Sequence, residues 1–159
     1  MKTLKTLLAF FSLAIVFAAC EDDAEKAILK SDVAANELQA PSASSYVLTL
    51  ANKDNTLETF KWTMPDFGFK AAVAYSLEVD VAGNNFANAV EVATSSTDPE
   101  VEVNVGAFND ILLGLGLAPE EPADVELRVV STVNDRVPPV YSTTKAIEVT
   151  PYATEFPPI

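Results

Sequence analysis

Strict alternation of apolar and polar residues is the feature of this sequence that most restricts its fold. From Val73 to Val81 every second residue is apolar or aromatic, and the residues between them include Ser76, Glu78 and Asp80. Side chains of a β-strand point alternately to the two faces of a sheet, so this period predicts a strand with one buried and one hydrated face. Such a strand belongs in a sheet that packs against a core on one side.

Further segments show a strand pattern bounded by turn-forming residues, which predicts seven strands at 46–50, 57–62, 73–81, 89–93, 101–105, 125–132 and 141–149. Helical spacing at 107–113, followed by Gly114 and Gly116, predicts one short helix before the sixth strand. A chain of 159 residues favours one domain. We therefore predict an all-β fold, an immunoglobulin-like or fibronectin-III-like sandwich at residues 45–152, with a C-terminal tail at 153–159.

The N-terminus has the pattern of an export signal. Lys2 and Lys5 precede an apolar run of about 13 residues that ends in two alanines before Cys20, the only cysteine of the chain. Because a membrane-spanning helix needs about 20 residues, the run predicts a signal peptide at residues 1–19 rather than a span. The position of Cys20 resembles a bacterial lipobox, so we expect this residue to carry the lipid anchor. The alternative is an ordinary secretory signal with an incidental cysteine.

Residues 20–44 are predicted to form a flexible tether. They are rich in Ala, Asp, Glu, Asn, Gln and Ser without a sustained apolar period, and Pro41 would end any helix. The acidic run 21–23 resembles the signal that places some bacterial lipoproteins on the outer face of the outer membrane. Its alternative interpretation is a solvated acidic leader.

Composition excludes several classes of function. The chain has 10 Lys+Arg against 23 Asp+Glu, a formal charge of −13 and no histidine. Nucleic-acid binding depends on basic side chains that displace counterions, so we expect no nucleic-acid partner. Without histidine there is no Ser-His-Asp triad and no histidine zinc site, and one cysteine forms no internal disulfide. No phosphate-binding loop or EF-hand pattern occurs, so we expect no cofactor and no metal.

Two groups of residues are candidates for a site. Sugars stack on exposed aromatic rings, and the aromatic candidates are Trp62, Phe67, Phe69, Phe86, Tyr141 and Tyr152. The strand pattern turns Trp62 and Tyr75 inward, and loop aromatics more often cover the ends of a core. A glycosidase would need two converging carboxyls, for which the candidates are Glu100, Glu102, Glu120, Glu121 and Asp124. We expect these carboxylates to be solvated, and the chain not to be an enzyme.

Several segments together resemble a known family. A Trp on the second strand and a Tyr on the third are typical of fibronectin-type sandwiches. More specifically, the chain is similar to the N-terminal domain of SusE-like outer-membrane lipoproteins of starch-utilization systems, on the residues Cys20 and its acidic followers, 40–41, 48–50, 60–63, 75–80, 82–86, 109–117, 128–129 and 149–152.

The resemblance implies a place and a role. In that family the immunoglobulin-like domain resembles a spacer, and the starch contacts belong to domains that follow it. Here the sequence stops at Ile159, soon after the last predicted strand. We therefore expect a lipid-anchored surface protein of the outer membrane that acts as a spacer or protein-interaction module beside a glycan importer. The alternative is a lectin-like module that binds a polysaccharide through loop aromatics.

Overall fold

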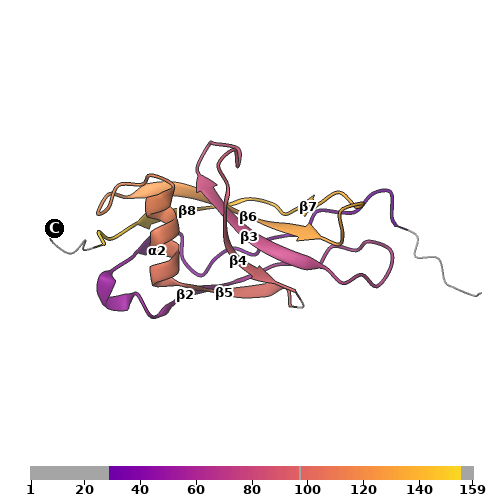
Figure 1. The fold of residues 1–159 in the computed structure, drawn as a ribbon, viewed down its shortest axis with the longest axis horizontal. Helices are drawn as coiled ribbons and strands as arrows, with labels where there is room; N and C mark the ends of the chain where they lie inside the picture. The colour runs from indigo at the N-terminus through magenta and orange to yellow at the C-terminus, as the bar shows by residue number, and fades with distance from the viewer. Residues whose placement is uncertain (1–28, 97, 155–159) are drawn as a thin grey trace, which may run out of the picture.

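Two β-sheets enclose one hydrophobic core (Figure 1). The computed structural model describes residues 29–96 and 98–154, so Cys20 and the predicted signal peptide lie outside the described residues. The strands of the described part are β1 (Ser45–Val47), β2 (Thr56–Lys61), β3 (Ala74–Val81), β4 (Val90–Ser95), β5 (Glu100–Asn104), β6 (Ala123–Thr132), β7 (Val140–Tyr141) and β8 (Lys145–Thr150). The helix α2 (Val105–Gly114) and the 3-10 turn η1 (Leu50–Asn52) complete it. The predicted all-β fold with one short helix is confirmed.

The larger sheet has the strand order β1-β8-β6-β3-β4, with β7 pairing with β6 beyond the end of β8. Its centre is the antiparallel pair β3 and β6, in which Leu77 faces Val129 and Glu78 faces Arg128. Leu77 and Val129 are fully buried, whereas Glu78 and Arg128 lie on the opposite, outer face. The alternation read from the sequence thus corresponds to one face of this sheet in the core.

The smaller sheet consists of β2 and β5, and α2 closes one end of the sandwich. The side chain of Asn104 accepts hydrogen bonds from the backbone N–H groups of Gly106 and Ala107, which fixes the helix start directly after β5. Phe108 and Leu112 point from the helix into the core and are fully buried. The helix is therefore longer at its start than the predicted 107–113, because the Asn104 cap converts the end of a predicted strand into helix.

A short segment before β1 belongs to the folded part. Residues 36–39, which we call the strap, run antiparallel to the end of β2: Leu38 pairs with Trp62, and Gln39 N donates to Lys61 O at 2.9 Å. On the other side, Thr143 N donates to the carbonyl of Asn36 at 3.2 Å. The predicted tether, residues 20–44, is thus not free along its whole length. From residue 36 on it contacts both sheets.

The first and last predicted strands differ from the structure. The predicted strand 141–149 is divided into β7 and β8, because Val129 N donates to the Ser142 side-chain oxygen at 2.8 Å, in place of a backbone carbonyl. The predicted strand 46–50 ends at Val47. After it, Asn52 N donates to Thr49 O and closes the turn η1. The turn therefore begins before residue 52, where the sequence predicts it.

Candidate functional site

Two of the six candidate aromatic residues form part of the hydrophobic interior. Trp62 is 3% exposed and its ring centroid lies 5.3 Å from that of Tyr75, as expected for inward-facing positions. Phe67 is 2% exposed, although it lies in the loop between β2 and β3. Neither ring can offer a face to a ligand. Phe67 therefore covers the end of the core, which is the more common role of a loop aromatic residue.

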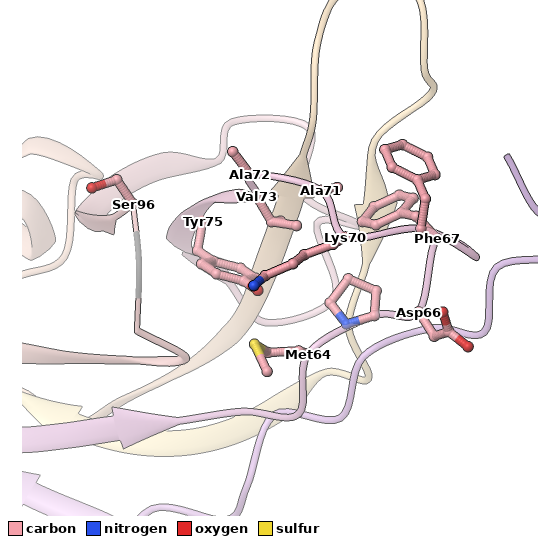
Figure 2. A pocket seen from close by; sticks show the side chains of 11 residues that line it. Met64, Asp66, Phe67, Lys70, Ala71, Ala72, Val73, Tyr75 and Ser96 are labelled. Atoms are coloured by element: carbon pink, nitrogen blue, oxygen red, sulfur yellow. The ribbon is translucent and has the colours of Figure 1, made fainter. Parts of the chain in front are cut away.

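The β2–β3 loop lies at the end of the sandwich where residue 29 enters (Figure 1), and it forms a hollow of about 460 Å³ (Figure 2). Its lining residues are Met64, Pro65, Asp66, Phe67, Phe69, Lys70, Ala71, Ala72, Val73, Tyr75 and Ser96. Figure 2 shows the side chains of Met64, Lys70 and Tyr75 directed into the hollow and Asp66 directed away from it. The lining is mostly apolar, and its polar side chains are those of Asp66, Lys70, Tyr75 and Ser96. Burial raises the pKa of Tyr75, so this phenol remains protonated.

The chain enters the fold beside this hollow. Lys30 N donates to Phe67 O at 2.9 Å, and the Lys30 ammonium bonds to the Asp66 carboxylate. The hydrogen bond from the Lys30 ammonium, with a further one from Gly68 N at 2.9 Å, lowers the pKa of Asp66. Asp66 is therefore occupied with holding residue 30 in place. The hollow contains no second carboxylate among its lining residues with which an acid–base pair could form.

A second group of side chains meets on the outer face of the larger sheet. Arg128 is held between two aromatic rings, with its guanidinium carbon 4.1 Å from the Phe86 ring centroid and 4.3 Å from that of Tyr141. Its Nε donates to Glu78 Oε2 at 2.9 Å. We call these four residues the Arg128 cluster. Tyr141 is 45% exposed, so this ring, unlike Trp62 and Phe67, presents surface to the solvent.

The β3–β4 loop brings Phe86 to this cluster, and Asp80 shapes the loop. The fully buried Asp80 carboxylate accepts hydrogen bonds from Val81 N at 2.7 Å, from Asn84 Nδ2 at 3.1 Å and from Asn88 N at 2.9 Å. Burial alone would raise the pKa of Asp80, but these hydrogen bonds and the nearby Arg128 charge outweigh it and lower the pKa. Within the loop, Phe86 has a positive φ of 58°.

Next to the Arg128 cluster lies a groove of about 490 Å³ over β3, β4 and β6. It shares Glu78 with the cluster and is lined further by hydroxyl and carboxylate groups, among them Ser76, Glu91, Thr94 and Thr132. Ser76 Oγ donates to Glu91 Oε2 at 2.9 Å, so the groove already contains an ordered hydroxyl–carboxylate contact. Aromatic surface, a guanidinium and carboxylates thus occur together on this face.

The remaining aromatic candidates have other partners. Phe69 is half-buried in the lining of the hollow. Tyr152 is half-buried as well, and its backbone is bound on both sides by the fully buried side chain of Asn109, whose Nδ2 donates to Tyr152 O at 3.1 Å and whose Oδ1 accepts from Tyr152 N at 2.8 Å. Asn109 therefore fixes the chain after β8 against α2.

The candidate carboxylates do not converge. On β5, Glu100 forms an ion pair with Lys61 at 2.9 Å and Glu102 accepts a hydrogen bond from Thr56 at 2.8 Å, both at the surface. The other three carboxylates are exposed: Glu120 and Glu121 lie in the loop before β6, whereas Asp124, expected in that loop, lies in β6. Within residues 29–96 and 98–154, no group of three or more acidic, histidine or cysteine side chains could hold a metal ion.

A family model described as SusE outer membrane protein matches residues 22–130. This range is more than two thirds of the chain and includes β1 to β5, α2 and most of β6. The chain belongs to the SusE outer membrane protein family.

The SusE family match agrees with the resemblance inferred from the sequence. It includes β3 with Asp80, the loop that carries Phe86, and Arg128, but not Tyr141. No match was found among the curated proteins. In this SusE-family chain, none of the helices within the described ranges has the length and apolarity that a membrane crossing requires.

Sequence reasoning missed two parts of the site. Arg128 lies within the predicted strand 125–132, and its partners Phe86 and Tyr141 are each more than ten residues distant in the sequence, so no local pattern joins them. Asp80 was assigned to the hydrated face of its strand. A signal did exist, because an aspartate just before the run Gly83-Asn84-Asn85 is well placed to accept hydrogen bonds from a turn.

Proposed function

We propose that this protein is a lipid-anchored, non-catalytic accessory protein of an outer-membrane glycan-utilization system, in which the sandwich serves as a spacer or protein-interaction module. The observation that carries the proposal is the SusE family match over residues 22–130. The scattered carboxylates and the absence of histidine from the chain support a non-catalytic role. Polysaccharide and importer proteins are the partners that the family name and system imply.

Anchoring depends on Cys20 and the predicted signal peptide at residues 1–19. Two or three acyl chains on this residue would hold the protein on the membrane, since each buried methylene contributes about 0.8 kcal/mol. Metabolic labelling with an alkyne fatty acid is expected to label the natural chain and not the Cys20→Ser variant, which should leave the membrane fraction. Labelling that persists in Cys20→Ser would contradict this assignment.

A partner in the outer membrane can be tested independently of the anchor. Mild detergent extraction followed by affinity purification is expected to recover a porin-type importer with the natural chain. The control is the same purification from cells without that importer gene, in which the chain should still reach the membrane. Recovery of the chain alone, with its anchor intact, would argue against an accessory role in a complex.

A second candidate function, glycan binding, is favoured by one observation: Tyr141 and Phe86 flank Arg128 next to a groove lined by hydroxyls and carboxylates. Sugars are bound by stacking on aromatic rings and by polar groups of this kind. Affinity electrophoresis through gels containing starch or other polysaccharides should then show retardation that Tyr141→Ala reduces. The control variant Met64→Ala changes an exposed residue that lines the hollow and not the groove. Unchanged mobility on every polysaccharide would exclude this function.

A further inference from the structure

Beneath the strap, four polar side-chain atoms are buried and have no hydrogen-bond partner among the described residues. They are Oδ1 and Nδ2 of Asn36, Nε1 of Trp62 and Oγ of Ser131. The three residues are at most 3% exposed. Folded proteins pair nearly all of their buried polar groups, either with protein atoms or with ordered water. Three such side chains in one region therefore indicate a shared partner.

The three side chains come from different layers and approach the same end of the core. Asn36 precedes Leu38 by two residues, so both side chains point to the same face of the strap, and Leu38 pairs with Trp62. The ring of Trp62 contacts that of Tyr75. Tyr75 is in turn the direct cross-strand partner of Ser131. The strap, the residue directly after β2 and strand β6 of the larger sheet thus contribute one unpartnered polar side chain each.

The donors and acceptors of this set select a class of ligand. Trp62 can only donate, whereas the Asn36 amide and the Ser131 hydroxyl can both donate and accept. The set contains no carboxylate for a metal ion and no positive charge for an anion. A small neutral molecule that both donates and accepts fits it, and a buried water typically makes about three such hydrogen bonds.

We propose that Asn36, Trp62 and Ser131 form an internal water site that joins the strap to both sheets. The backbone of Asn36 is fixed by the hydrogen bond from Thr143 N, so its amide stays inside. Leu38 fills the core beside the site and is fully buried. Water-mediated hydrogen bonds are nearly as favourable as direct ones. The strap is therefore attached by an apolar side chain and by a hydrated polar contact next to it.

The single tryptophan of the chain gives this proposal a direct probe, since its indole N–H produces one resolved proton signal. In the chain 21–159, which contains every described residue, we expect a dipolar cross-peak between this proton and a long-lived water. The cross-peak should persist in Tyr75→Phe, which removes a nearby hydroxyl that could relay exchange, and should disappear in Asn36→Leu. Absence of the cross-peak from the natural chain, or its persistence in Asn36→Leu, would overturn the proposal.

The stability of the Asn36→Leu variant gives a second test. The direction in which its urea midpoint changes shows whether the Asn36 amide is paired with water or has no partner. If water pairs with the amide, Asn36→Leu should lower the urea midpoint of unfolding, because it removes a partner from the water and leaves Trp62 unpaired. If the amide is buried without any partner, the same substitution should raise the midpoint, and the proposal would be wrong. The control is Gln39→Leu, an exposed position on the strap, which should leave both the midpoint and the cross-peak unchanged.

Discussion

Asp80 occupies a strand position at which alternation alone would place a hydrated side chain. Its neighbours Ser76 and Glu78 on the same face are only partly buried, but Asp80 is fully buried. The difference arises from the loop after β3, in which the Asn84 side-chain amide and the backbone N–H of Asn88 donate to the carboxylate. A buried carboxylate is tolerated where several donors satisfy it, so at this residue the turn overrides the strand pattern.

The charge of Asp80 should make the fold sensitive to acid. Because the folded state lowers the pKa of Asp80 below its ordinary value of 3.8, its ionised form stabilises the fold above that pH. This contribution is lost as the pH falls below 3.8 through the folded-state pKa. Asp80→Asn should therefore flatten the acid side of the stability curve, measured as urea midpoints against pH. The matched control is Glu121→Gln at an exposed site, which should leave the curve as it is.

Removal of the Asp80 side chain should also release the loop. Asp80→Ala leaves the donors of Asn84 and Asn88 without their acceptor, so we expect the free energy of unfolding at neutral pH to fall by about 2–3 kcal/mol. Hydrogen exchange of the Asn88 amide should accelerate more than that of amides in the centre of β6. Equal acceleration throughout the chain would show that Asp80 stabilises the whole fold without any special effect on the loop.

At the scale of elements, the sequence predicts those parts of the fold that local patterns determine. The alternation of apolar and polar residues was sufficient to predict β3 and β6. The glycines after α2 were sufficient to predict where the helix ends, and Gly116 there adopts a positive φ of 87°. The division between β7 and β8 could not be foreseen, because it depends on the side chain of Ser142 meeting Val129 of another strand. The same holds for the Arg128 cluster, which forms only when three distant segments are brought together.

The strap is the element whose role differs most from expectation. Its composition resembles a linker, and Leu38 is its one large apolar residue. Tertiary contacts decide its state, since that leucine is fully buried between the sheets. Further along the predicted tether, Ser42 N donates to Glu58 Oε2 at 3.0 Å, so the attachment continues towards β1.

Truncation tests where the folded part begins. A chain that starts at residue 45 lacks the whole predicted tether and should be strongly destabilised, whereas a chain that starts at residue 29 should match the 21–159 chain. Within the longer chain, Leu38→Ala should lower the free energy of unfolding by about 2–5 kcal/mol, typical of a buried leucine. Urea unfolding followed by the fluorescence of Trp62 measures both. Equal stability of the chains starting at 29 and 45 would contradict the role of the strap.

At the scale of the whole molecule, the chain enters at one end of the long axis and leaves β8 at the other (Figure 1). The hollow with Lys70 lies at the entry end, and the loop between α2 and β6 with Glu121 lies at the exit end. If Cys20 is the anchor, the entry end faces the membrane and the Glu121 loop faces away from it. The two ends should then differ in access from outside the cell.

Introduced cysteines can measure this difference, because the single natural cysteine would be acylated and unreactive. On intact cells, a membrane-impermeant maleimide should label Glu121→Cys faster than Lys70→Cys, both of which are exposed positions. After cell lysis in detergent the two rates should become similar, which controls for local reactivity. Absence of labelling at both positions before lysis would place the domain on the inner side of the outer membrane.

The lengthwise course of the strap has a mechanical consequence. The strap lies alongside residues 61–63, which follow the long axis of the sandwich, and hydrogen bonds join the two segments. The chain enters the fold beyond these hydrogen bonds, at one end of that axis. Tension applied between the two ends would therefore strain these bonds in shear, so that they carry the load together. A pull at right angles to the axis would instead open them one after another at much lower force.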